Sequence, residues 1–171
     1  MIKARTDNEI ELTALDLTAM WSIQPGRGIS LDDFTAAVFS EQMPGDGRLL
    51  TNNGLQLLRP WPHQAYLIAD QPALPSTAQP FVTLVTDIAD AFCAFRLDGE
   101  AAGDFLADYL SADITAAAPK NDCLRCRLGH YTVLLWWQDR VRLQLLVERS
   151  LAQSFTEYIK RLLARRQREQ S

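Results

Sequence analysis

Apolar and polar residues alternate along several short segments in the second half of the chain, and a period of two is typical of half-buried strands. Turn residues such as Gly129 and Asp139 separate the last three of these segments. The pattern therefore predicts strands at positions 81–88, 91–97, 123–128, 131–137 and 141–147.

Two other segments of this half have helical spacing. Residues 98–110 predict a helix, because the following side chains gather on one side: Phe105, Leu106, Tyr109 and Leu110. Ser150 is a suitable N-cap for a last helix that runs past Leu163. The core-facing stripe expected on that helix consists of Leu151, Phe155, Tyr158 and Leu162.

The first half of the chain predicts one helix and three extended segments. Residues 10–18 have a mixed period, which fits a strand or an extended arm. Ser30 is expected to cap a short amphipathic helix with Asp33 in its acidic first turn. The apolar stripe of that helix is Leu31, Phe34 and Val38. Segments 54–60 and 64–70 predict two strands joined by a reversal at Pro60, Trp61, Pro62 and His63.

The C-terminal part thus has the order β-β-α-β-β-β-α, which predicts the α+β class, a largely antiparallel sheet with packed helices. Residues 71–80 contain three prolines and are the best candidate for a linker. Because neither half shows a clear core of its own, we expect a single domain over residues 1–171, with an external loop at 71–80 and a basic end of the last helix at 160–171.

Composition narrows the function classes. The 171 residues are 47% hydrophobic and 22% charged, and the net charge of −4 argues against nucleic acid as a partner. We found no leader and no apolar segment long enough to span a bilayer, so we expect a cytoplasmic chain with no membrane partner. Three cysteines, an odd number, fit a reducing compartment. The basic segment 160–168 fits a solvated helix end or a docking segment for an acidic partner.

Cys123 and Cys126 form a CxxC pair, which raises the question of a redox or zinc site. Residues i and i+3 of a strand face opposite sides of the sheet, so these thiols are not expected to meet. A zinc site would need His130 and a further ligand, and a second CxxC or an HxxxH motif is absent from the sequence. We therefore interpret both cysteines as structural.

The other chemical-looking residues also fit structural roles. His63 and His130 lie in turns without a nearby carboxylate or nucleophile motif. The pair Asp32 and Asp33 belongs to a helix start, and Asp104 and Asp108 belong to a polar helix face. No lipase-type, zinc-protease, P-loop or dinucleotide motif occurs. The sequence predicts no catalytic, cofactor-binding or metal residues, and an unrecognised enzyme that uses a cysteine is a third alternative.

Large aromatic and arginine side chains are candidates for an interface, where these residue types carry much of the binding energy. Trp136 and Trp137 place one ring on each face of a strand, so one of them needs cover from a helix or from another chain. The candidate interface residues are Trp61, Trp136, Trp137, Arg149, Arg165 and Arg166.

Several segments, in order, resemble one family. They are Cys123 to Gly129, Val133 to Leu135 and Leu145 to Ala152, preceded by Pro44 to Arg48, Trp61-Pro62, Tyr66 to Ile68, Thr86 to Ala91 and Arg96 to Gly99. Together they resemble the gamma subunit of heterotetrameric sarcosine oxidase over residues 44–163. The chain departs from that family at 113–117, where an Asp-Leu-His-Pro-Arg segment is usual, and at Leu151 and Tyr158, where Phe and Trp are usual.

The resemblance implies a fold like the folate-binding domain of the glycine-cleavage aminomethyltransferase. It also implies a non-catalytic subunit without a cofactor of its own, whose complex demethylates sarcosine oxidatively to glycine. In such complexes the alpha subunit holds NAD and tetrahydrofolate, the beta subunit holds FAD and shares FMN, and the delta subunit binds zinc. Two alternatives stay open: a subunit acting on another N-methyl amino acid, and a stand-alone folate-binding protein.

Overall fold

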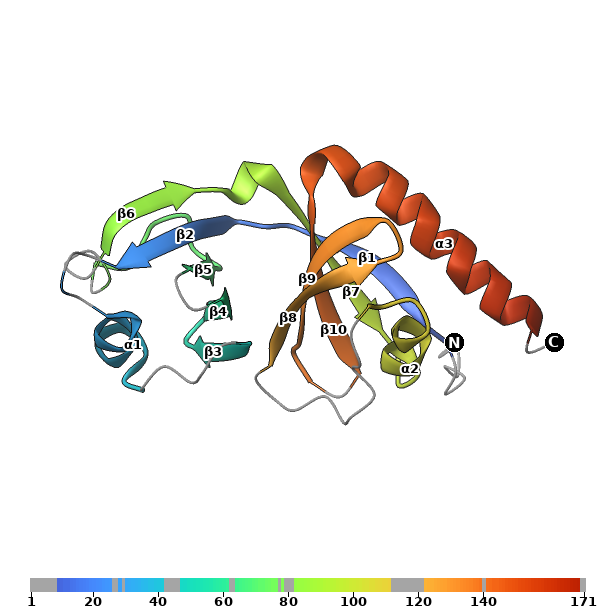
Figure 1. Ribbon diagram of the computed structural model, residues 1–171, viewed down its shortest axis with the longest axis horizontal. Coiled ribbons are helices and arrows are strands. Elements are labelled where there is room, and N and C mark those ends of the chain that lie inside the picture. The colour runs from blue at the N-terminus through green and yellow to red at the C-terminus, as the bar shows by residue number, and fades with distance from the viewer. Residues whose placement is uncertain are drawn as a thin grey trace, which may run out of the picture. The chain divides into compact units, whose positions relative to one another are not determined.

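The computed structural model describes residues 9–25, 28, 30–41, 47–61, 64–76, 78, 82–111, 122–139 and 141–169. Strands predominate in the described residues (Figure 1). They are β1 (Glu11–Leu15), β2 (Ala19–Pro25), β3 (Arg48–Asn52), β4 (Leu55–Trp61), β5 (Gln64–Ala69), β6 (Val82–Asp87), β7 (Phe92–Asp98), β8 (Cys123–Leu128), β9 (Tyr131–Trp137) and β10 (Arg142–Glu148). The helices are α1 (Leu31–Phe39), α2 (Ala102–Ala107) and α3 (Ala152–Glu169), with 3₁₀ turns η2 (Ala89–Ala91) and η3 (Arg149–Leu151).

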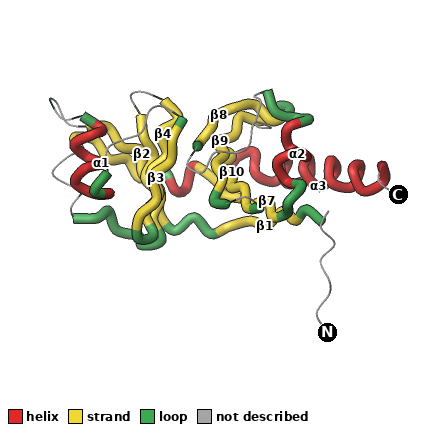
Figure 2. Tube along the Cα trace, turned by 90° about the horizontal axis from the view of Figure 1, so that it is seen from below, coloured by secondary structure: helices red, strands yellow, loops and turns green. Residues whose placement is uncertain are grey.

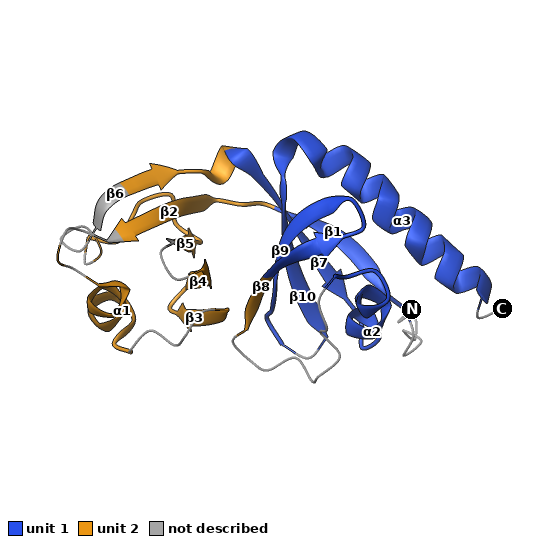
Figure 3. Ribbon diagram, in the orientation of Figure 1, with its two compact units in different colours: residues 1–15, 91–120, 125–171 blue, residues 16–90, 121–124 orange. Residues whose placement is uncertain are grey.

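These elements group into two compact units (Figure 3). Unit 1 consists of residues 1–15, 91–120 and 125–171, and unit 2 consists of residues 16–90 and 121–124. The sequence predicted one domain in which the proline-rich loop 71–80 is the main interruption. The unit boundaries fall elsewhere, and that loop segment belongs to unit 2. Composition does not mark the boundaries, because each unit is assembled from segments that are distant in the sequence.

Unit 1 is built on a five-stranded sheet in the order β1-β7-β10-β9-β8. β7 pairs antiparallel with β1 on one side and with β10 on the other, and β10 pairs antiparallel with β9. In this register Phe95 lies opposite both Ala14 and Leu145. The central strands supply the core, in which Leu97, Val133 and Leu143 are completely buried.

Helix α3 packs on this sheet through aromatic contacts. Phe155 and Ile159 are 0% exposed, and the Phe155 ring lies 5.3 Å from the rings of both Phe95 and Tyr131. The ring of Tyr158 lies 5.4 Å from that of Tyr131. Aromatic pairs at such distances contribute about 0.5–1.5 kcal/mol each beyond the burial of area. Of the helices in the described ranges, none combines the length and apolarity needed to span a bilayer.

The start of α3 differs from the sequence-based expectation. Ser150 does not cap the helix; it lies inside η3, and α3 begins at Ala152. Leu151 is 37% exposed and is not part of the core-facing stripe, whereas Ile159 is buried in its place. A 3₁₀ turn has three residues per turn, so the positions before Ala152 are out of phase with the α-helical stripe.

Unit 2 contains the second sheet, in the order β3-β4-β5-β2-β6, with antiparallel pairings throughout the described residues. Helix α1 contributes Phe34 and Phe39 to the hydrophobic cluster of this unit. The predicted cap is present: the Asp33 amide donates to Ser30 Oγ at 3.1 Å, and the Ser30 amide donates to Asp33 Oδ2 at 2.8 Å. This reciprocal capping fixes where α1 begins.

Strand β3 was missed in the sequence, although its turn carries a recognisable signal. Asn53 and Gly54 have φ values of 47° and 78°, the positive values that a type I′ hairpin turn requires. The flanking strands pair Leu50 with Leu57 and Leu49 with Leu58. An Asn-Gly pair between apolar runs predicts a hairpin, and this hairpin joins β3 to β4.

The other expected elements are present with small changes of length. β4 to β10 confirm the strands expected from 54–60 onwards, and α2 is shorter than the helix expected at 98–110. Of the extended arm expected at 10–18, residues 11–15 form β1 in the sheet of unit 1, whereas residues 16–18 belong to unit 2 and lead into β2. The expectation of a largely antiparallel α+β fold is therefore confirmed, with two sheets in place of one.

The turn between β8 and β9 gives a stability prediction. Gly129 has φ +59°, and a Cβ placed on it would lie 2.5 Å from the Tyr158 hydroxyl oxygen. Gly28 also has a positive φ, +80°, but no atom lies within 4 Å of the position that an added Cβ would occupy. We expect Gly129→Ala to lower the free energy of unfolding by about 2 kcal/mol or more, and Gly28→Ala by about 1 kcal/mol, since only the first adds a clash to the backbone strain. Urea denaturation measures both; equal losses would show that Tyr158 does not press on this turn.

Candidate functional site

The two thiols of β8 are buried and lie on opposite faces of the strand. Cys123 is 2% exposed and Cys126 is 7% exposed, and both are free thiols. Burial raises the pKa of Cys123 to about 12 and that of Cys126 to about 11. Nucleophilic and redox cysteines need a lowered pKa and access to solvent. Neither thiol has the properties of a reactive group.

Cys123 is buried although Arg125 and Arg127, which share its face of β8, are exposed. Its amide donates to the Gly47 carbonyl at 2.8 Å, and its thiol donates to the Arg48 carbonyl at 3.0 Å. The Arg48 guanidinium also forms an ion pair with Asp122. Residues 121–124 belong to unit 2, as β3 does, so Cys123 holds this short segment on the start of β3 within one unit, which is a structural role.

Metal donors do not gather in the part of the chain that the structure describes. No group of three or more His, Cys, Asp or Glu side chains there is arranged to hold an ion. His130 is exposed in the turn between β8 and β9. His63 lies outside the described residues, and so does segment 113–117, where the sequence differs from the family that it resembles. Within the described residues, the CxxC pair therefore has no further side chains with which it could form a zinc site.

The acidic pairs lie on exposed helix positions. Hydrogen bonds from the Ser30 backbone and side chain lower the pKa of Asp33, so this carboxylate serves the cap of α1. Asp104 lies in the first turn of α2, and Asp108 is the C-terminal cap residue of that helix. All four carboxylates are exposed, and they lie in the first turn or at the end of a helix. These positions fit structural roles.

Two of the three candidate interface tryptophans are inside the protein. Trp136 is 1% exposed and Trp137 is 8% exposed, which corrects the expectation that these rings contribute to an exposed surface. The sequence predicted that one of these rings would be covered by a helix or by another chain, and α2 covers Trp137. The approach is so close that a Cβ added to Gly103 of α2 would lie 2.9 Å from the Trp137 ring. Glycine at this position lets α2 approach the indole closely. Trp61 is half-buried and its ring makes an edge contact with Tyr66, with centroids 6.3 Å apart.

The candidate arginines have different surroundings. Arg166 is half-buried, and its guanidinium lies 5.8 Å from the ring centre of Phe105 in α2, so it belongs to the packing of α2 and α3. Arg165 is exposed and pairs with Glu169 at 2.8 Å. Arg149 is exposed in η3. Arg165 and Arg149 therefore remain on the surface, whereas Arg166 is largely engaged within unit 1. The two helices of that contact, α2 and α3, are drawn in red in Figure 2.

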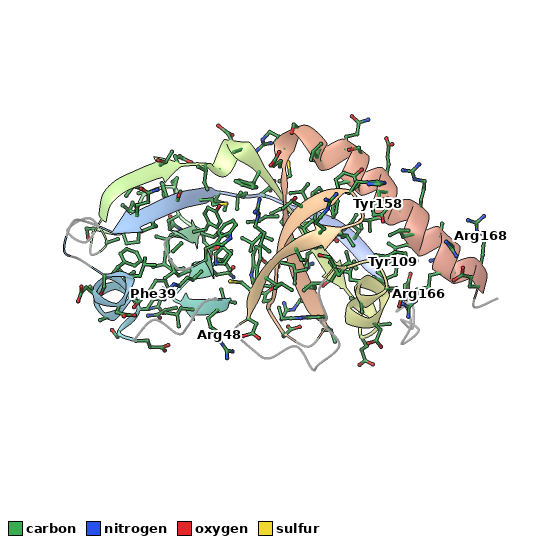
Figure 4. The ribbon with its side chains drawn as sticks, viewed as in Figure 1. Phe39, Arg48, Tyr109, Tyr158, Arg166 and Arg168 are labelled. Atoms are coloured by element: carbon green, nitrogen blue, oxygen red, sulfur yellow. The ribbon has the colours of Figure 1, made fainter. Side chains whose placement is uncertain are left out.

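A basic surface on α3 was only partly identified by the interface residues chosen from the sequence. Its members are all exposed and are here named the basic stripe: Lys160, Arg161, Arg165 and Arg168. Helical spacing places Arg161 and Arg168 opposite Phe155 and Ile159, and it places Lys160 and Arg165 on the two flanks of that outer side. Figure 4 shows Arg168 on the outer side of α3 and Arg166 beside α2. Helical spacing is the signal that separates Arg166 from its basic neighbours.

Burial of the β8 thiols gives a chemical prediction. At about pH 8, a thiol with a pKa of about 12 has roughly a thousandfold less thiolate than one at the ordinary value of 9. We expect iodoacetamide to label Cys93, which is half-buried, long before Cys123 and Cys126 in the folded protein. Peptide mass spectrometry would follow each site, with urea-unfolded protein as the control in which all three react alike. Labelling of Cys123 or Cys126 at the unfolded rate without denaturant would contradict the structural interpretation.

One comparison with known proteins, that with solved structures, bears on the fold. No family model matches this chain, and the search of curated proteins by sequence also gave no match. Among solved structures, a chain of the heterotetrameric sarcosine oxidase from Corynebacterium sp. U-96, in complex with pyrrole 2-carboxylate, superposes with a TM-score of 0.81. The identity is 19%, and the match covers 94% of this chain and 87% of that chain. This protein therefore shares the fold of one chain of a heterotetrameric sarcosine oxidase.

Proposed function

We propose that this chain is a non-catalytic, gamma-type subunit of a multi-subunit, flavin-dependent oxidase that removes the methyl group of sarcosine or a related N-methyl amino acid. The observation that carries the proposal is the superposition over nearly the whole of both chains. Because the match covers 94% of this chain and 87% of the other, the two are of similar length. The likeness is thus to a complete small subunit and not to one domain of a large one.

The side chains described above support a role without chemistry of its own. The β8 thiols are buried with raised pKa values, and the acidic pairs are solvated. The segments on which the sequence resemblance rests also have structural positions. Residues 123–129 form β8 and its turn, and residues 145–152 form the end of β10, η3 and the first residue of α3. Their residue types are explained by packing and by the connection between elements.

The proposal assigns the cofactors and the remaining contacts to other subunits. FAD, FMN, NAD, tetrahydrofolate and zinc belong to the alpha, beta and delta subunits, with which this chain would assemble in the cytoplasm. The aminomethyltransferase-like, folate-binding fold implied by the sequence stays part of this proposal. A subunit of this kind contributes by completing and stabilising a larger assembly, since anything that binds only the folded, assembled state stabilises it.

The test is isolation of the assembly from the cell that makes this protein. With an affinity tag on this chain, we expect two larger subunits to co-purify, with the visible absorbance of oxidised flavin and with sarcosine-dependent oxygen uptake. Mass spectrometry would identify each co-purifying chain. The matched control is the tagged chain produced alone, which we expect to be colourless and inactive. Recovery of only the free chain, with no flavoprotein, would contradict the proposal.

A separate measurement distinguishes the stand-alone folate-binding alternative. Tetrahydrofolate would raise the melting temperature of the isolated chain only if that chain bound it, because a ligand stabilises by RT ln(1 + [L]/Kd). The proposal predicts no shift at ligand concentrations that shift an authentic folate-binding protein. A shift of several degrees would favour the alternative.

A further inference from the structure

The outer side of α3 carries a concentration of positive charge that the fold of unit 1 does not use. The buried side of the helix, with Phe155 and Ile159, packs on the sheet. The basic stripe occupies the outer side and its flanks, all of its members are exposed, and Glu157 is an exposed acidic residue on the same side. In the described part of the chain, Lys160 and Arg161 make no ion pair, whereas Arg165 pairs with Glu169. Arg168 donates to the Ala164 carbonyl at 3.3 Å, so Lys160 and Arg161 are the members of the stripe most available to an external partner.

Helix stability accounts for only part of this charge. Basic residues in the last turn interact favourably with the C-terminal end of the helix dipole, and Arg166 and Arg168 occupy that turn. Lys160 and Arg161 lie two turns earlier, where this effect has faded. Arg161 and Arg165 are four residues apart, and like charges at that spacing destabilise a helix. Glu157, four residues before Arg161, and Glu169, which pairs with Arg165, offset this repulsion. Helix stability therefore neither requires nor forbids the charge of Lys160 and Arg161, which leaves room for a second role.

The charge of the rest of the protein limits what that partner is. The chain has a net charge of −4, so the residues outside the four-residue basic stripe carry −8. Such an acidic background repels the continuous phosphate backbone of a nucleic acid. Leu151 and Val141 are the large apolar residues exposed in the described ranges, and neither lies among the stripe residues. A helix that lies on a membrane needs an apolar face free to enter the lipid, and the apolar face of α3 is already buried.

A second copy of this chain also offers acidic surface, but the contact would join two unlike faces. Such a head-to-tail contact either closes into a ring or continues into an open chain. A different protein with a local acidic face forms a single contact with the basic stripe, so the assembly stays finite in size. Complementary charge of this kind steers association and fixes the orientation of the partners.

We propose that the basic stripe of α3 docks on an acidic face of a larger subunit in the assembly. This inference rests on the proposed function, because it names the surface through which the chain joins its complex. The stripe supplies the steering charge, while the opposite side of the same helix keeps α3 fixed on unit 1. Attachment through the stripe is consequently weakened by salt, since charge pairs on exposed surfaces are screened.

The experiment compares two charge-reversal variants of the tagged chain in the assembly. One is Lys160→Glu with Arg161→Glu, in the stripe; the matched control is Arg125→Glu with Arg127→Glu, at exposed positions on β8 with the same change of charge. Circular dichroism and thermal melting check that each variant folds. We expect the stripe variant to bind the flavoprotein subunits on the order of tenfold more weakly, and the β8 variant to bind as the unaltered chain does. The milder Lys160→Ala with Arg161→Ala serves if the reversal prevents folding.

The outcomes separate this inference from the function on which it rests. Assembly of the unaltered chain that weakens with salt and with the stripe variant supports both. Normal assembly of the stripe variant, with no dependence on salt, overturns the docking surface and leaves the proposed function in place. Failure of the unaltered chain to assemble overturns the proposed function, and the docking surface with it. Binding of the unaltered chain to duplex RNA, to phosphatidylserine vesicles or to itself, lost in the stripe variant, overturns the assignment to a protein subunit.

Discussion

Alternation along β-strands is the constraint on which the account of this protein depends. Side chains two residues apart share a face, and side chains an odd number apart do not. On β8 this rule sends Cys126 and Leu128 into the protein and leaves Arg125 and Arg127 at the surface. The same rule separates the two cysteines of the CxxC pair. A pattern that resembles a redox or zinc motif thus becomes part of a sheet, and its thiols become packing groups.

Helix α3 shows how one element serves both the fold and the proposed assembly. Its inner side meets Phe95 and Tyr131 through Phe155, and Tyr158 presses on the glycine turn between β8 and β9. These contacts set the direction and rotation of the helix on unit 1. Once the inner side is fixed, helical periodicity determines which basic residues face outward. The docking surface is therefore a consequence of packing, and it does not require a mobile tail.

Sequence reasoning identified most elements because their signals are local. Alternation found β4 to β10, and Ser30 with Asp33 marked the start of α1. Features that depend on contacts between distant segments were less accessible. The division into two units, the burial of Trp136 and the hydrogen bond from Cys123 to Arg48 all join residues far apart in the chain. Ser150 was misplaced because a 3₁₀ turn precedes α3, as is frequent at helix ends, and the residue pattern alone did not show where that turn gives way to the α-helix.

The central claim is that this polypeptide supports the active site of a neighbour and has none of its own. Native mass spectrometry of the chain, purified without its partners after growth in medium that supplies zinc and riboflavin, tests it most directly. The account predicts the mass of the bare polypeptide, with no bound flavin, folate or metal. A stoichiometric mass increase equal to a flavin or a zinc ion would contradict it.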